Sequence, residues 1–462
     1  MGVTAKADEA DTLSPEPARA AHRLRLSLDR SKFTRRHLAM YLTIALGHFM
    51  DGFDILMIGL VLPGAAASFG LAPADKGVLA SSVFTGMLIG TIIVGPIADR
   101  IGRKPVLITA VIAYCLLSLA AAFTTSYHEL LAVRVLQGIG LGAEVPIVFT
   151  YLSEFMPTER RGFMLASSVF FWQASTFVAA FIAILVVPHY TWRGMFVVAA
   201  IPAIVLIFLW SHLPESVRFL INKGRTEEAE KVVRRISTVN PDSITEAPPT
   251  TRPPEPARFR DLISGHYTRP TLGIWLWQFA GGGITVALVV WMPSLFLKMG
   301  FPVVKSFAYT GLIAGAGALG DMAGGWFIDR VGRRLGITAF YLIGGVMMFV
   351  WGAATNSTLV LIFGALTAFF GSGHGGPLFA YCSEIYPTRF RTAGTGWSAA
   401  FQRIGAIVIP SFLGVLLGAG ASHYIFFAVM GVILLVGGVG GYLLSFETRG
   451  KSLEEITDHL AR

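Results

Sequence analysis

Two aspartates interrupt an otherwise apolar stretch near the start of the chain. Residues 47–63 read GHFMDGFDILMIGLVLP, and Asp51 and Asp54 are three positions apart. That spacing places both carboxyl groups on one face of a helix, with His48 one turn further back. Ionisable groups are costly inside a bilayer and are generally functional there. Two adjacent, poorly solvated carboxyl groups resist simultaneous ionisation, so this pair is suited to carrying a proton.

Structural roles remain open for the same acids, because either one would also serve to cap a bend at Gly52 or to pair with a neighbouring helix. Glu144 is a third candidate for proton coupling. Arg134 lies about three helical turns from it, too far for direct pairing.

Arg403 is a cation inside a second apolar stretch, GWSAAFQRIGAIVIP (396–410). A guanidinium is always protonated and its planar fork fits a carboxylate, so an anionic substrate is its natural partner during transport. The alternative is a permanent salt bridge to Asp51, Asp54 or Asp321.

Other polar and aromatic side chains are candidates for contact with a flat ligand. His374 lies in GSGHGG, where it either titrates during the cycle or is a satisfied packing residue. Asp321 lies in GALGDMAGG, where it either pairs with Arg403 in the empty protein or makes a helix-packing contact. The remaining candidates are Phe171, Trp172, Gln173, Trp275, Trp277, Gln278, Phe379 and Tyr381.

The elements that must position these residues are membrane helices. Of the 462 residues, 54% are hydrophobic and 14% are charged, which is too apolar for a soluble domain. A bilayer core needs about 20 apolar residues in a helix. Twelve such runs occur, at about 38–63, 77–98, 105–123, 129–150, 164–187, 192–212, 271–297, 306–328, 336–354, 358–381, 395–418 and 423–446. Cys115 and Cys382 have no ligand-like spacing and are interpreted as packing residues.

The positive charges predict the orientation of the chain. Lys and Arg cluster in the leader, in the loops after even-numbered helices and in the tail, whereas the other loops hold only Lys76, Lys298 and Lys305. This pattern predicts cytoplasmic termini and explains the net charge of +9 without a nucleic-acid partner. We therefore expect a polar cytoplasmic leader (1–36), a six-helix bundle (37–212), a cytoplasmic linker (213–270), a second six-helix bundle (271–446) and a cytoplasmic tail (447–462). Within the linker, residues 226–236 are predicted to form an amphipathic helix, followed by the proline-rich segment 247–256.

An internal repeat supports the division into halves. GPIADRIGRK (95–104) aligns with GWFIDRVGRR (325–334), and YLSEFMPTERR (151–161) aligns with YCSEIYPTRFR (381–391), both at a separation of 230 positions. Because that interval holds an even number of helices, the two halves have the same orientation in the membrane. We predict an all-α membrane protein of two parallel six-helix bundles.

These repeated loops resemble the signature of the major facilitator superfamily of transporters. RVLQGIGLG (134–142), PESVRFL (214–220) and FETRGKSLEEI (446–456) also resemble motifs of that superfamily. DGFD (51–54) and RIGAI (403–407) are similar to the aromatic acid:proton symporters, and GAEVP followed by YLSE (142–154) to niacin-type organic-anion carriers. The resemblance implies a conformational latch of cytoplasmic ion pairs, formed by Asp99, Arg103, Asp329 and Arg333 and extended by Glu154, Arg161, Glu384 and Arg391.

The expected function is proton-coupled symport of a small organic monocarboxylate such as benzoate, hydroxybenzoate or nicotinate. The expected assignments are Asp51, Asp54 and Glu144 for proton coupling, and Arg403, Gln173, Trp172, Gln278, His374, Asp321 and Tyr381 for substrate binding. No cofactor is expected, because the proton gradient supplies the energy, and the protein is expected to be a monomer in the plasma membrane. A sugar or polyol porter is the alternative, although Gln278 stands without the glutamine and asparagine partners that sugar porters carry in this helix. The sequence shows no nucleophile–base, metal or phosphate-loop pattern that would indicate an enzyme.

Overall fold

The described part of the chain is entirely helical. A computed structural model describes residues 15–246, 259–386 and 388–449, and no strand occurs among them. Twelve of its spans are long and apolar enough to cross a membrane, which confirms the all-α prediction and the predicted number of spans. The proline-rich segment 247–256 lies outside the described residues.

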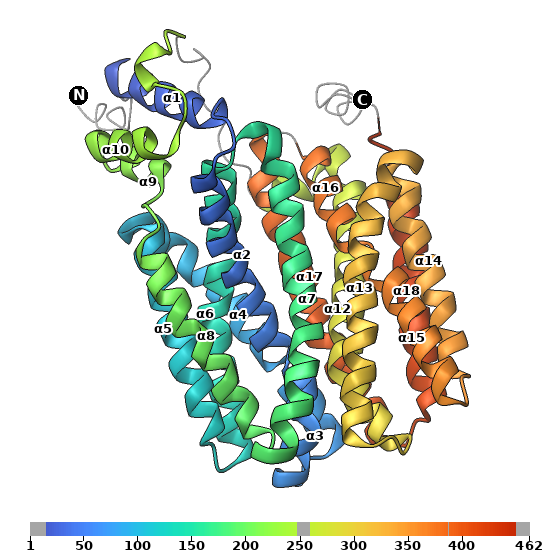
Figure 1. The fold of residues 1–462 in the computed structure, drawn as a ribbon. Helices are drawn as coiled ribbons and strands as arrows, with labels where there is room; N and C mark the ends of the chain where they lie inside the picture. Colours follow the sequence, from blue (N-terminus) through green and yellow to red (C-terminus); the bar gives the residue numbers. More distant parts are fainter. Residues whose placement is uncertain (1–14, 247–258, 387, 450–462) are drawn as a thin grey trace, which may run out of the picture.

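The helices divide into a first half, a connecting segment and a second half (Figure 1). The first half contains α1 (Pro15–Asp29), α2 (Arg35–Leu56), α3 (Ile58–Phe69), α4 (Pro73–Ile101), α5 (Arg103–Ala122), α6 (Tyr127–Phe155), α7 (Thr158–Tyr190) and α8 (Arg193–Ser211). Between the halves lie α9 (Val217–Asn222), α10 (Thr226–Ile236) and α11 (Phe259–Leu262). The second half contains α12 (Thr268–Lys298), α13 (Val303–Val331), α14 (Arg333–Gly352), α15 (Ser357–Ser372), α16 (Gly375–Ile385), α17 (Thr388–Gly418) and α18 (His423–Leu444).

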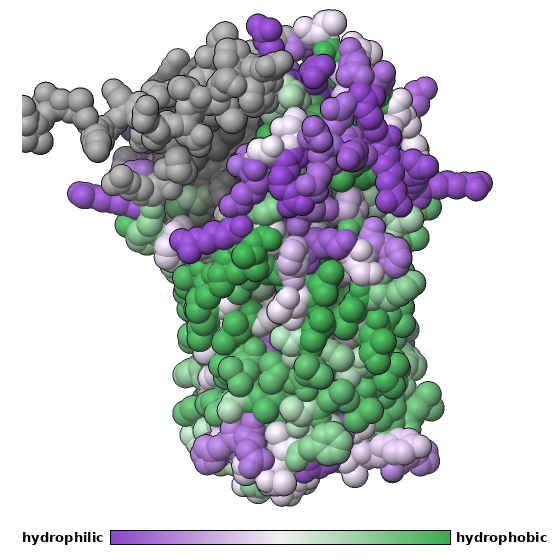
Figure 2. Space-filling model, turned by 90° about the vertical axis from the view of Figure 1, so that its left-hand side faces the viewer, coloured by the Kyte–Doolittle hydropathy of each residue, from purple (hydrophilic) through white to green (hydrophobic). Residues whose placement is uncertain are grey.

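The membrane helices form two bundles that stand side by side (Figure 1). Helix α2 begins and α18 ends at the same face of the molecule, where α1, α9 and α10 also lie (Figure 1). On the face seen in Figure 2, an apolar band crosses the middle of the molecule, and hydrophilic side chains gather toward both ends. This distribution matches a bilayer that surrounds the middle of the helices.

Two of the membrane spans are broken. The first changes from α2 to α3 at Met57, and the tenth changes from α15 to α16 at Gly373 and His374. Proline lacks a backbone N–H, so Pro377 cannot donate to the carbonyl of Gly373, four residues earlier. The break at Gly373 brings the first residues of α16 to the middle of the second bundle.

The two bundles pack closely at the end opposite α1. Helix α3 packs against α12, α4 against α17, and α7 against α13. A Cβ atom at Gly77 of α4 would lie 2.9 Å from the carbonyl oxygen of Pro410 in α17, and one at Gly59 would lie 2.5 Å from that of Val289. Only glycine permits such close backbone approach. Ser81 and Ser411 also form a hydrogen bond of 2.8 Å across this contact, so this end of the molecule is closed.

The segment before the first membrane helix is folded onto the linker. Helix α1 packs against α10, which confirms the amphipathic helix predicted at 226–236. Arg30 donates to Glu246 at 2.8 Å, and Ser27 donates to the carbonyl of Val239 at 2.6 Å. These contacts attach the linker to the first half at the face of the molecule where the chain begins.

Candidate functional site

A cavity of about 130 Å³ lies between the two bundles. It is far larger than the space one water molecule needs. Nine helices contribute to its wall, four from the first bundle and five from the second, together with His374 between α15 and α16. The lining residues are His48, Phe84, Met87, Phe149, Val169, Trp172, Gln173, Gly282, Thr285, Val286, Asp321, Ser372, His374, Gly375, Phe379, Gln402, Arg403 and Ala406.

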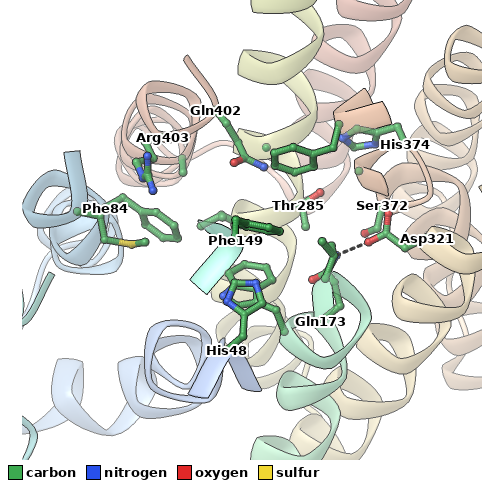
Figure 3. A pocket seen from close by; sticks show the side chains of 18 residues that line it. His48, Phe84, Phe149, Gln173, Thr285, Asp321, Ser372, His374, Gln402 and Arg403 are labelled. Atoms are coloured by element: carbon green, nitrogen blue, oxygen red, sulfur yellow. Dashed lines mark hydrogen bonds between the residues drawn. The ribbon is translucent and has the colours of Figure 1, made fainter. Parts of the chain in front are cut away.

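Arg403 of α17 brings a cation to this cavity (Figure 3). Its side chain is only 7% exposed. Two residues later, a Cβ at Gly405 would lie 2.1 Å from the carbonyl oxygen of Phe279, so α17 and α12 are in backbone contact beside the arginine. This contact fixes where the guanidinium lies.

No acidic side chain of the described residues pairs with Arg403. The permanent salt bridge to Asp51, Asp54 or Asp321, considered as an alternative, is therefore absent in this structure. A buried cation without a counter-charge favours an anion that supplies one.

Aromatic rings from both bundles form walls of the cavity. Phe149 of α6 and Phe379 of α16 stack across the boundary between the bundles, with ring centroids 6.3 Å apart and an angle of 30°. His48 meets Phe149 edge-on at 5.7 Å. Phe84 and Trp172 complete the aromatic lining. Flat apolar faces beside a guanidinium match a ligand with an aromatic ring and an acidic group.

Asp321 and Gln173 connect the bundles at one side of the cavity. Gln173 Nε2 of α7 donates to Asp321 Oδ2 of α13 at 3.4 Å, drawn as the dashed line in Figure 3. Gly376 of α16 donates its backbone N–H to Asp321 Oδ1 at 3.1 Å. Asp321 therefore binds the start of a half-helix and a residue of the opposite bundle.

Asp54 does not line the cavity and is paired within the first bundle. Arg134 Nη1 of α6 lies 3.2 Å from Asp54 Oδ2, and Gln137 Nε2 donates to the same oxygen at 2.7 Å. Ser118 of α5 donates to Oδ1 at 3.2 Å. The residues of the ion pair are at most 2% exposed. The contacts of Asp54 therefore match the alternative of pairing with a neighbouring helix.

Asp51 and Glu144 form a different arrangement in the same bundle. Both are fully buried and interact with each other in the interior of the bundle. Among the described residues, none of their four carboxyl oxygens has a hydrogen-bond partner. His48 Nδ1 lies 3.8 Å from Asp51 Oδ2, and the ring of His48 faces the cavity. His48 is thus the side chain between this carboxyl pair and the cavity.

The remaining predicted substrate-binding residues divide into two groups. Trp172 and His374 line the cavity. Gln278 and Tyr381 lie outside its wall, because Gln278 is buried beside Cys382 and the Tyr381 hydroxyl donates to the carbonyl of Phe446 at 2.8 Å. Much of the lining was not predicted from the sequence, including Phe84, Met87, Phe149, Thr285, Ser372 and Gln402.

The predicted latch residues form one network in each half. In the first half, Arg103 pairs with Glu154, and Ser216 donates to Glu154 at 2.6 Å. In the second half, Arg333 lies 2.9 Å from Glu384 and Thr448 donates to Glu384 at 2.6 Å.

Two further latch residues pair close to these networks. Asp329 pairs with Arg333 at 3.2 Å, whereas Arg161 pairs with Asp29 of α1. The side chains of Asp99 and Arg391 lie outside the described part. Every latch ion pair in the described part joins residues of the same half.

The fold and the inter-bundle cavity define a transporter with two pseudo-symmetric halves, and the comparisons agree. The model of the family described as "Sugar (and other) transporter" matches residues 40–460, and the chain belongs to this family within the major facilitator superfamily. Its members are transporters and not enzymes. The protein is thus a multi-pass membrane transporter.

Relatives and solved structures resemble the chain over most of its length. The niacin transporter NiaP of Acinetobacter baylyi is 32% identical over 91% of this chain and 96% of its own. The gallate transporter of Pseudomonas putida is 33% identical over 83% of this chain and 86% of its own. The 4-hydroxybenzoate transporter PcaK of the same species is 31% identical over 80% of this chain and 84% of its own. The xylose transporter XylE of E. coli, in a partially occluded inward open conformation, has the same fold, with a TM-score of 0.76 at 19% identity over 90% of this chain and 99% of that one.

Proposed function

We propose that the protein is a proton-coupled symporter that imports small aromatic monocarboxylates across the plasma membrane as a monomer. The observation that carries this proposal is the unpaired Arg403 guanidinium in a cavity walled by aromatic rings from both bundles. The substrate carboxylate supplies the missing counter-charge while its ring stacks on the phenylalanines. Relatives named for niacin, gallate and 4-hydroxybenzoate support the same substrate class.

The carboxyl pair Asp51–Glu144 is the proposed proton site. Two neighbouring carboxyl groups that are buried away from solvent hold one proton between them, because ionisation of one group opposes ionisation of the other. His48 lies on the path between the pair and the cavity, at 3.8 Å from Asp51. Asp54 has a structural role in this scheme, because its charge is neutralised by Arg134.

The transport cycle follows from these charges. Protonation of the pair and docking of the carboxylate on Arg403 reduce the buried charge of both bundles, which lets the bundles rock about the cavity. The cytoplasmic placement of both termini belongs to this proposal and rests on the distribution of Lys and Arg. Uptake should therefore rise as the external pH falls, since protonation precedes entry.

A counterflow experiment tests the proposal. Purified protein in proteoliposomes would be loaded with one unlabelled compound and given labelled benzoate, nicotinate, 4-hydroxybenzoate or a sugar, at an acidic and at a neutral pH. Aromatic acids should exchange and sugars should not, with faster net uptake of acids at acidic external pH. Exchange of sugars alone would refute the proposal and favour the sugar-porter alternative.

A further inference from the structure

Asp321 supplies a second charged group to the cavity, of opposite sign to Arg403. The two side chains lie at opposite sides of the cavity in the view of Figure 3, with Phe149 between them. Asp321 is 7% exposed, and no cation of the described residues acts on its carboxylate. The cavity therefore has an anionic and a cationic side, neither neutralised by a charged neighbour.

The two carboxylate oxygens of Asp321 have different surroundings. Oδ1 accepts from the backbone N–H of Gly376, and Gly375 also contacts the group, so the carboxylate caps the start of α16. The positive end of a helix dipole stabilises a negative charge at this position. Among the described residues, the hydrogen bond found to Oδ2 is the one from Gln173 at 3.4 Å, longer than a typical N–H···O bond. This oxygen has unused capacity to accept hydrogen bonds.

We propose that Asp321 selects aromatic acids that carry a ring hydroxyl. The carboxylate of the substrate binds Arg403, its ring lies against the phenylalanines, and the hydroxyl donates a hydrogen bond to Asp321 Oδ2. This inference rests on the proposed function and narrows its substrate class. Benzoate has no such donor, and the ring nitrogen of unprotonated nicotinate is itself an acceptor. Hydroxybenzoates therefore bind more tightly than either compound.

Competition for counterflow tests this selectivity in the wild-type protein. Labelled benzoate would be competed with 3- and 4-hydroxybenzoate and with the fluorobenzoates of the same ring positions, which are similar in size but lack the hydroxyl proton. At least one hydroxybenzoate should compete about tenfold better than its fluoro analogue, because hydrogen bonds to charged groups are strong and a lost partner leaves Asp321 unsatisfied. Equal competition by both members of each pair, or stronger competition by nicotinate, would overturn the inference.

Asp321→Asn supplies the second measurement. The amide retains one oxygen for the α16 cap, while its NH₂ replaces the accepting Oδ2 with a donor. The variant should lose the tenfold preference for the hydroxyl. Asp242→Asn, in the exposed linker, is the matched control and should keep the preference.

The failures of the inference and of the function are distinguishable. If the wild-type protein exchanges benzoate but Asp321→Asn keeps the preference for hydroxybenzoates, Asp321 does not bind the substrate hydroxyl. In that case only the inference about Asp321 fails. If no aromatic acid exchanges in wild type, the proposed function fails as well. If the variant does not fold, the wild-type competition alone decides, because hydroxybenzoates that compete no better than their fluoro analogues exclude the hydroxyl contact.

Discussion

Three groups of intramembrane charges among the described residues have different kinds of partner. Asp54 is held by Arg134 and Gln137, Asp51 lies beside Glu144, and Arg403 lines the cavity. A rare charge inside a membrane must be neutralised by something. The first arrangement joins two opposite charges. The second is the proposed site of the transported proton, and the third is the proposed site of the substrate anion.

The two aspartates of α2 should therefore respond differently to amide substitution. Asp51→Asn keeps a polar side chain beside Glu144 but removes one of the two carboxyl groups of the proposed proton site, so gradient-driven accumulation should be lost while counterflow persists. Asp54→Asn leaves the Arg134 charge buried and unpaired, which costs about 3–5 kcal/mol, so this variant should melt at a markedly lower temperature. Uptake under a pH gradient and thermal unfolding in detergent measure the two effects. Accumulation by Asp51→Asn at the wild-type level would exclude Asp51 as the proton site.

The charges inside the membrane could be located from the sequence more readily than their partners. Arg403 stands out because a guanidinium inside an apolar helix is rare. The pairing of Arg134 with Asp54 was not predicted, because the spacing along one helix excludes contact between Arg134 and Glu144 but says nothing of other helices. Asp54 and Arg134 carry opposite charges in the same bundle, and a buried charge requires a partner of opposite sign. That requirement could have indicated the pair from the sequence.

At the scale of helices, the structure relates two sequence motifs that the internal repeat did not connect. PESVRFL follows the sixth membrane span and FETRGKSLEEI the twelfth. Glu215 accepts from the backbone N–H of Arg103 at 3.1 Å, and Glu447 accepts from that of Arg333 at 2.8 Å. The two segments therefore make the same contact in each half. Their separation differs from 230 positions, so an alignment at constant offset could not reveal them.

In the proposed cycle, helices α4 and α17 separate, because they pack together at the closed end of the molecule. Ser81→Cys combined with Ser411→Cys places two thiols where the hydroxyl oxygens are 2.8 Å apart. Oxidation should link the bundles and abolish counterflow, and reduction should restore it. Each single cysteine variant serves as control and should be insensitive to the oxidant. Full counterflow by the cross-linked protein would show that this contact does not open.

For the whole molecule, the number of spans and the two-bundle fold could be predicted from the sequence because apolar length and repeated loops report them directly. The residues that line the cavity could be predicted less completely than the fold. Phe84 and Phe149 resemble many other aromatic residues in a chain that is 12% aromatic, and only the packing of the bundles selects them. Gln173 lies 230 positions before Arg403, at the equivalent place in the repeat, and both line the cavity.

The most direct measurement of the central claim is calorimetric binding of benzoate and of benzamide, which has the same ring but no charge. The unpaired guanidinium predicts that wild type binds the acid about 100-fold more tightly than the amide. Arg403→Gln should bind the two equally weakly, and Arg403→Lys should recover only part of the difference, because it keeps the charge without the planar fork. Equal affinity for acid and amide in wild type, or an undiminished preference for the acid in Arg403→Gln, would contradict the account.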